Sequence, residues 1–181
     1  MSAIKKIRVL LVQGGPSVEH DISIKSARMV ASALDDTRFD YHLVHITRNG
    51  KWKFKNNAEL PFGRAMMKIE RGNFDVAFIA LHGTFGEDGK IQSVFEALGL
   101  PYIGSGPEAS SCALNKATSA SIFKENGLTH PNFIHLTNTS QKPKLDRFTF
   151  PLVVKPCHGG SSIQISFAKN PSQVWSAAKK I

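Results

Sequence analysis

Hydrophobic positions in the first half of the chain alternate between short apolar runs and runs with helical spacing. Residues 7–13 form a mostly apolar run that ends at Gly14-Gly15, a pattern typical of a buried parallel strand. Similar patterns predict three further strands, at 41–46, 74–81 and 102–103. Strands that alternate with helices and end in glycine predict an open parallel α/β sheet.

Two amphipathic helices are predicted between these strands. The first follows Gly15, and its apolar positions share one face: Ile22, Met29, Val30, Ala33 and Leu34. The second has apolar residues at i, i+3, i+4 and i+7, namely Ile91, Val94, Phe95 and Leu98. Gly99 is the expected end of this second helix.

The pattern changes after about Ala109. A helix and then two strands are predicted there, at 115–126, 151–155 and 163–167. The glycine-rich stretch 157–162 joins the two strands, which indicates a β-ribbon and not a βαβ unit. The sequence therefore predicts a first domain at 1–109 and a second domain at 110–181.

A last helix is predicted to begin at Asn170-Pro171, since asparagine is a good helix cap and proline suits the first turn. Its apolar positions again have helical spacing: Val174, Ala177, Ala178 and Ile181. A ribbon and two helices offer little surface to cover this face. We expect the face to stay open, as in an incomplete domain.

Composition narrows the class of protein. Of 181 residues, 41% are hydrophobic, so wholesale disorder is excluded. No apolar run approaches the roughly 20 residues of a membrane span. The first residues predict a strand and not a signal peptide. The pair Cys112 and Cys157 cannot form a disulfide framework, which favours a reduced compartment and a cytoplasmic location.

The net charge of +9 admits anionic partners, and the densest basic run is Arg48–Lys55. One interpretation is a nucleic-acid strand that stacks bases on Trp52 and Phe54. The other is structural: Asn49-Gly50 forms a tight turn, and lysines then alternate outward with aromatic residues inward. Alternation alone explains the run, so the structural interpretation is favoured.

Ligands of open parallel sheets bind beyond the carboxyl ends of the strands. The segments predicted there are 14–19, 82–88 and 104–106. The first lacks the G-x-G-x-x-G spacing of a dinucleotide site. Glu19 has two interpretations: a carboxylate that suits a helix N-terminus, or a partner for a substrate ammonium.

The loop from His82 to Gly89 combines a histidine, two acids and three glycines, which predicts a ligand-facing loop. His42 and His45 are three apart on a strand, so they lie on opposite faces and cannot share a metal. The sequence shows no serine or cysteine hydrolase arrangement.

Lys155 stands at a strand end and is followed by glycines and by the hydroxyls of Ser161 and Ser162. A point charge with a flap of donors suits phosphate. The order of residues is not that of a Walker A loop. The alternative is a glycine hairpin with an exposed lysine.

Together these motifs resemble the D-alanine–D-alanine ligases of the ATP-grasp superfamily. The resemblance rests on five stretches in family order, 14–23, 81–92, 101–106, 114–116 and 153–163. It implies an α/β fold: a Rossmann-like pre-ATP-grasp domain with an open parallel sheet, followed by the start of an ATP-grasp α+β domain.

The resemblance also implies the reaction. ATP would phosphorylate the carboxylate of one D-alanine, and the amine of a second would attack the acyl phosphate, making a precursor for peptidoglycan and cell-wall synthesis. Glu19 and Ser161 would be catalytic, with Glu19 orienting the first ammonium and His82 lining that subsite. The residues expected to bind ATP are Lys116, Lys155, Ser161 and Ser162.

The family's Mg²⁺ (or Mn²⁺) ligands are expected beyond Ile181, so we expect a fragment that is inactive alone. A homodimer through the first domain is implied, without nucleic acid or membrane as partner. The sequence departs from the family at Asn115, Ala120 and Gln164, where aspartate, lysine and glycine are usual. The alternatives are another ATP-grasp carboxylate–amine ligase or a basic nucleic-acid-binding module.

Overall fold

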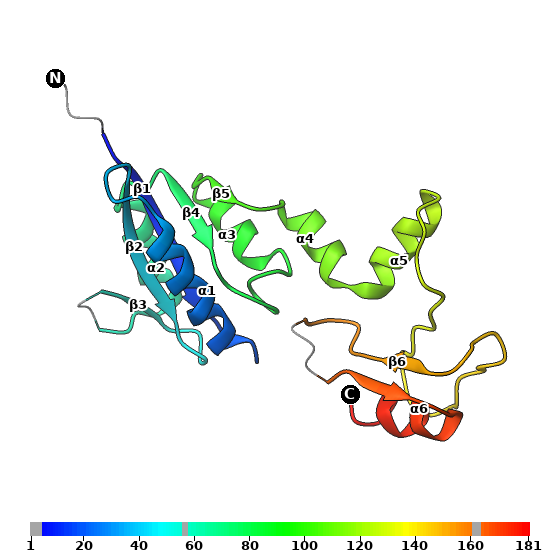
Figure 1. Cartoon of the computed structure of the whole chain (residues 1–181). Helices are drawn as coiled ribbons and strands as arrows, with labels where there is room; N and C mark the ends of the chain where they lie inside the picture. The colour runs from blue at the N-terminus through cyan, green and yellow to red at the C-terminus, as the bar shows by residue number, and fades with distance from the viewer. Residues whose placement is uncertain (1–4, 56–57, 161–163) are drawn as a thin grey trace. The chain divides into compact units, whose positions relative to one another are not determined.

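The computed structural model describes residues 5–55, 58–160 and 164–181. The chain divides into two compact units, Met1–Ser111 and Cys112–Ile181, called here the first and second unit (Figure 1). Helix α4 (Pro107–Leu114) contains the boundary between them. Each unit is described by itself.

Within the described residues of the first unit, five strands form one sheet in the order β3-β2-β1-β4-β5. These strands are β1 (Ile7–Gly14), β2 (Phe39–Ile46), β3 (Trp52–Phe54), β4 (Val76–Ile79) and β5 (Tyr102–Ile103). β1 pairs in parallel with β2 and β4, and β4 with β5, whereas β3 is antiparallel to β2. The predicted open α/β sheet is confirmed, with one antiparallel edge strand.

Strand β1 lies at the centre of the sheet and is buried on both faces. Residues Val9 to Val12 are at most 3% exposed, which explains the continuous apolar run in the sequence. One core cluster joins the sheet to α2 (Phe62–Glu70) and α3 (Lys90–Ala97). A second cluster joins it to α1 (His20–Ala33), so the helices form layers on both faces.

The apolar face predicted for the first helix is wrong in part. Ile22 and Met29 are 37% and 72% exposed, whereas Ser23 and Ala27 are fully buried. Small side chains on the inner face allow α1 to approach the sheet closely, and the Ser23 hydroxyl satisfies backbone groups there. A prediction from large apolar residues alone therefore assigned the wrong side of the helix to the sheet.

The basic run forms a β-hairpin, as its structural interpretation predicts. The Thr47 N–H donates to the Lys51 carbonyl at 2.8 Å across the turn. Trp52 and Phe54 are 1% and 7% exposed in the core, while Lys53 points to solvent. Because both aromatic rings are buried, they cannot stack on nucleic-acid bases.

The second unit contains a short β-ribbon and two complete helices among its described residues. Its elements are α5 (Lys116–Glu125), β6 (Leu152–Val154), β7 (Ser166–Ala168) and α6 (Pro171–Ala178). β6 and β7 are antiparallel, which confirms the predicted ribbon, although β7 begins later than expected. Ile163, the predicted first residue of that strand, lies outside the described residues.

Helix α6 begins at the predicted cap, where the Asn170 side chain accepts a hydrogen bond of 3.0 Å from the Gln173 N–H. The expectation that its apolar face stays open is wrong. Val174 and Ala177 are 5% and 8% exposed, and α6 packs on the ribbon next to buried Ala168. Only the terminal Ile181 of the predicted face lies beyond the helix and is half exposed.

Ser23 joins α1 to the carboxyl ends of two central strands. Its Oγ accepts a hydrogen bond of 2.8 Å from the Gly14 N–H and donates one of 2.7 Å to the Ala80 carbonyl. The residue is fully buried, so no solvent can replace these bonds. One hydroxyl thus fixes the helix, the end of β1 and the segment after β4 together.

We predict that Ser23→Ala lowers the free energy of unfolding of the first unit by about 2–3 kcal/mol, because a buried N–H and a buried carbonyl lose their partner. Ser32→Ala is the matched control on the same helix, since the Ser32 hydroxyl bonds to Met29 at an exposed site. It should change stability by less than about 0.5 kcal/mol. Urea unfolding followed through amide signals of the first unit measures both; equal effects would contradict the assignment.

Candidate functional site

A tight glycine turn begins the site. Gly14 has φ +88°, and a Cβ on it would overlap the Ile46 carbonyl oxygen, so only glycine fits there without strain. The next N–H, of Gly15, donates to that same carbonyl at 2.7 Å. The chain then turns at the carboxyl edge of the sheet and enters α1 at Glu19.

Glu19 is the N-cap residue of α1, yet its carboxylate does not cap the helix. The side chain is 2% exposed. Its backbone N–H donates to Ser17 Oγ at 3.0 Å, but no donor of the described chain reaches the carboxylate. The carboxylate has no partner in the described chain and does not cap the helix, which favours the ammonium-partner interpretation over the capping one.

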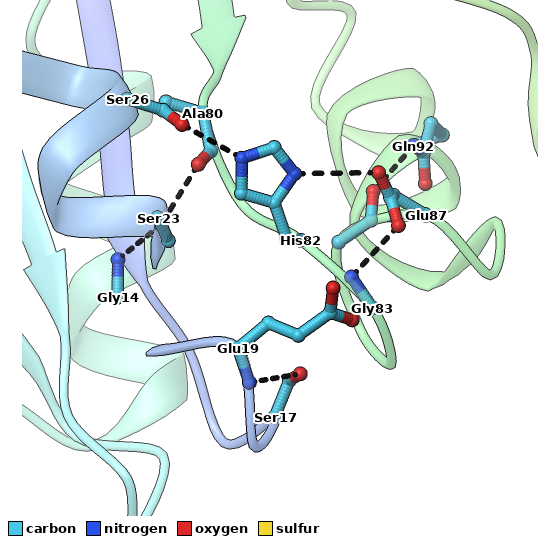
Figure 2. Close-up of polar contacts among 11 residues, drawn as sticks. Gly14, Ser17, Glu19, Ser23, Ser26, Ala80, His82, Gly83, Glu87 and Gln92 are labelled. Atoms are coloured by element: carbon cyan, nitrogen blue, oxygen red, sulfur yellow. Dashed lines mark hydrogen bonds and ion pairs between the residues drawn. The ribbon is translucent and has the colours of Figure 1, made fainter. Parts of the chain in front are cut away.

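The loop after β4 lies against this carboxylate (Figure 2). A Cβ on Gly83 would overlap both Glu19 Oε2 and Ser17 Oγ. His82, the preceding residue, has its Nε2 2.8 Å from Ser26 Oγ and its Nδ1 3.4 Å from Glu87 Oε1. The structure therefore brings two sequence-predicted residues, Glu19 and His82, to one edge of the sheet.

Several contacts fix the shape of this loop. The Phe85 ring packs against the core, with its centroid 6.5 Å from that of Trp52. Gln92 is buried, and its Nε2 donates to the Gly86 carbonyl at 2.8 Å. The loop is thus anchored at its middle by an apolar side chain and an amide.

The carboxylate of Asp88, near the end of the loop, pairs with the first residue of α3. Burial raises the pKa of Asp88, but hydrogen bonds from the Lys90 side chain and from the backbone outweigh burial, so the pKa lies below its ordinary value. The Lys90 ammonium is 2.7 Å from Asp88 Oδ2. Asp88 stays ionised as part of an ion pair, which leaves Glu19 and Glu87 as the acids facing His82 and Gly83.

In the second unit, the glycine-rich loop contacts the start of α5. The Lys116 N–H donates to the Cys157 carbonyl at 3.0 Å, and its ammonium donates to the Gly159 carbonyl. The Cys157 thiol donates to Asn115 Oδ1 at 3.1 Å. Lys116 is therefore beside the loop predicted to cover phosphates.

The other predicted nucleotide residues are less constrained. Lys155 is exposed, and no acid or hydrogen-bond partner from the described part of the chain contacts it. Its charge is therefore free to meet an anion. Ser161 and Ser162 lie outside the described residues, so their predicted roles stay predictions.

Two features are absent from the described residues. No group of three or more His, Cys, Asp or Glu side chains there could hold a metal ion. Across the same ranges, no helix is long and apolar enough to cross a membrane. We assign no described residue to Mg²⁺.

Comparison with known proteins gives the family. The family model described as "D-ala D-ala ligase N-terminus" matches residues 8–67 and 61–105, which together exceed half of the chain. This chain belongs to that family. The matched region contains both loops of the first-unit site, with Glu19 and His82.

Relatives of this D-Ala-D-Ala ligase family member extend over nearly the whole chain. The vancomycin B-type resistance protein VanB of Enterococcus faecalis is 35% identical over 182 residues, covering 90% of this chain and 53% of that protein. A D-alanine–D-alanine ligase of Staphylococcus epidermidis is 33% identical over 194 residues, covering 93% and 54%. The chain spans about half the length of the curated relatives it matches.

Solved structures of D-alanine–D-alanine ligases are similar to this chain as well. The D-alanine–D-alanine ligase of Coxiella burnetii has a TM-score of 0.82 at 25% identity, covering 97% of this chain and 60% of that one. The Bacillus anthracis ligase complexed with ATP has a TM-score of 0.72 at 31% identity, covering 96% and 54%. The α/β fold is thus shared with ligases of this family.

The structure shows the environment of the residues that depart from the family pattern. Asn115 caps α5, accepting from the N–H groups of Ala117 and Thr118 at 3.1 Å, a role aspartate would also fill. Gln164 adopts φ +60°, the left-handed region that favours glycine. Glutamine here strains the backbone where the family usually has glycine. Nothing in the structure explains Ala120.

Sequence reasoning missed the hydroxyls that surround the predicted residues. Ser17 holds the backbone of Glu19, and Ser26 contacts His82. A signal was present: Glu19, Ser23 and Ser26 are spaced i, i+4 and i+7, so they share one face of α1. A row of polar side chains on the helix face that packs on a sheet indicates that these side chains form hydrogen bonds with groups at the sheet edge.

We predict that Gly83→Ala destabilises the first unit by about 1 kcal/mol or more beyond Gly99→Ala. Both glycines have positive φ, +69° and +62°, so both variants incur the same backbone strain of about 1–2 kcal/mol. Only the Gly83 variant adds overlap with Glu19 and Ser17, because open space surrounds Gly99. Urea unfolding compares them; similar losses would show that Glu19 does not lie against Gly83.

His45 gives a pH prediction next to the glycine turn. Burial lowers the pKa of His45 below its ordinary value of 6.5, the charges of His20 and Lys53 lower it further, and Glu59 opposes them. The unfolded chain then binds the proton more tightly. The free energy of unfolding should therefore fall as pH drops below about 6.5, by at most about 1.4 kcal/mol per pH unit, and level off below the folded pKa.

Urea unfolding at pH values of about 7.5 and 5.5 measures this effect. His45→Gln should lose less stability between these pH values than the parent chain, whereas His135→Gln, an exposed control, should behave like the parent. An identical pH dependence in His45→Gln and the parent would disprove the assignment.

Proposed function

We propose that this chain supplies the first-substrate site and part of the ATP site of an ATP-dependent D-alanine–D-alanine ligase. The reaction joins two D-alanines through an acyl phosphate, for peptidoglycan precursor synthesis. Membership of the family, with named D-alanine–D-alanine ligases among its relatives, supports this function. A cytoplasmic location and a homodimer through the first domain are part of the same proposal.

The observation that carries the proposal is the Glu19 carboxylate. Glu19 is 2% exposed, its carboxylate accepts no hydrogen bond from the described side chains or backbone groups, and it lies at the carboxyl edge beside the His82 loop. An ammonium group would supply the missing charge and donors. Glu19 is then a catalytic residue that orients the first D-alanine, while His82 lines the same subsite.

The second unit would bind the nucleotide. Lys116 and Lys155 are the cations that would neutralise phosphate charge, with Ser161 and Ser162 as hydroxyl donors of the flap and Ser161 also near the substrate. Cations in a site closed to water stabilise the charge that develops on transferred oxygens. ATP supplies the phosphoryl group that activates the carboxylate. We propose no residue of this chain as a Mg²⁺ ligand.

Binding of D-alanine tests the proposal at Glu19. We expect D-alanine to shift the amide signals of Gly83 and neighbouring residues of the loop in a saturable way. Glu19→Gln should weaken binding by about 100-fold or more, because a buried charged pair loses one partner. Glu108→Gln, a control at an exposed glutamate of the same unit, should bind like the parent.

D-Lactate separates the ammonium from the rest of the ligand, since it has a hydroxyl in place of the amine. Its binding should be weak in the parent and unaffected by Glu19→Gln. If D-alanine and D-lactate bind equally well, or if Glu19→Gln leaves D-alanine binding intact, Glu19 is not the ammonium partner and the proposal fails.

A further inference from the structure

Ser26 connects helix α1 to the imidazole of His82. Its Oγ lies 2.8 Å from His82 Nε2 in a partly buried contact. Ser26 shares a helix face with Glu19 and Ser23, and Ser23 binds that face to the strand ends. Ser26 therefore has a fixed position relative to the loop that carries His82.

The other side of the imidazole faces a carboxylate, as Figure 2 shows. His82 Nδ1 lies 3.4 Å from Glu87 Oε1, and Glu87 Oε2 accepts a hydrogen bond of 2.8 Å from the Gly83 N–H. An ionised carboxylate can only accept hydrogen bonds, so the proton between these groups belongs to Nδ1. The Gly83 bond holds this carboxylate in place.

These two contacts determine where the neutral ring carries its proton. With Nδ1 protonated, Nε2 has the lone pair, and the hydroxyl that faces it can donate. We propose that Ser26 is a positioning residue for His82: its hydroxyl donates to Nε2 and holds the neutral imidazole in the Nδ1–H tautomer. This inference rests on the proposed function, in which His82 lines the D-alanine subsite.

The tautomer decides what His82 offers to a substrate. Nε2 accepts from Ser26 and Nδ1–H points to Glu87, so both nitrogens of the neutral ring are engaged. A general base needs a free lone pair within reach of the proton it removes. His82 therefore acts as an oriented wall beside Glu19 and not as a base.

A hydroxyl, an imidazole and a carboxylate in this order also activate the serine of hydrolases. That chemistry needs backbone donors for an oxyanion. The Gly83 N–H beside His82 already donates to Glu87. The arrangement therefore favours positioning over nucleophilic catalysis by Ser26.

Nitrogen NMR of the histidine rings tests the tautomer directly in the full chain. The spectra are recorded at pH of about 8.5, two units above the ordinary histidine pKa, with His82→Gln used to assign the ring. We expect Nδ1 to be protonated and Nε2 unprotonated in the parent. Ser26→Ala should shift the ring toward the Nε2–H form, and Ser26→Thr, which keeps the hydroxyl, should retain the parent tautomer.

A parent ring protonated at Nε2 overturns the proposal, as does a Ser26→Ala ring whose nitrogen signals are unchanged. The parent measurement stands even if a variant fails to fold. The tautomer is measured on the chain without D-alanine. If the ring is protonated at Nδ1 but the chain does not bind D-alanine, the proposed function is rejected while the positioning role of Ser26 stands.

The D-alanine titration adds the functional consequence. Ser26→Ala should raise the Kd about 2- to 10-fold, the equivalent of one lost hydrogen bond, and Ser26→Thr should restore it. Ser32→Ala, on the exposed face of the same helix, should have no effect. Covalent labelling of Ser26 by a fluorophosphonate would identify it as a nucleophile and overturn the positioning role.

Discussion

The geometry of the first unit depends on one buried hydroxyl. Ser23 Oγ accepts from the Gly14 N–H and donates to the Ala80 carbonyl, so it satisfies two backbone groups that solvent cannot reach. Strand ends need such partners where a sheet stops and its chains diverge. Because the partner comes from α1, the helix and the two strand ends have a fixed relation, and Glu19 and Ser26 follow from it.

The site is characterised by which of its polar side chains have hydrogen-bond partners within the fold and which do not. The Glu87 carboxylate, the Asp88 carboxylate and both His82 nitrogens have partners in the loop or in the adjoining helices α1 and α3. The Glu19 side chain is more buried than any of these three, and its carboxylate has no partner in the described structure. In the function that we propose, the partner that this carboxylate lacks is the ammonium of the first D-alanine.

Sequence alone predicted the sheet, its carboxyl-edge loops and the positions of Glu19 and His82, because apolar runs and strand-end glycines have strong local signals. It failed where a small polar side chain replaces a large apolar one. Ser23 lies on the buried face of α1, whereas Ile22 and Met29, which the apolar pattern predicted to be buried, are exposed. The burial of α6 was missed because packing on a ribbon depends on contacts distant in sequence.

The central claim is that Glu19 receives the ammonium of the first D-alanine. A crystal structure of this chain bound to D-alanine tests it most directly. The account predicts the ammonium nitrogen within hydrogen-bonding distance of a Glu19 carboxylate oxygen, with the His82 ring beside it and still bonded to Ser26. D-Alanine bound with its ammonium elsewhere, or a Glu19 carboxylate that has turned to cap α1, would contradict the account.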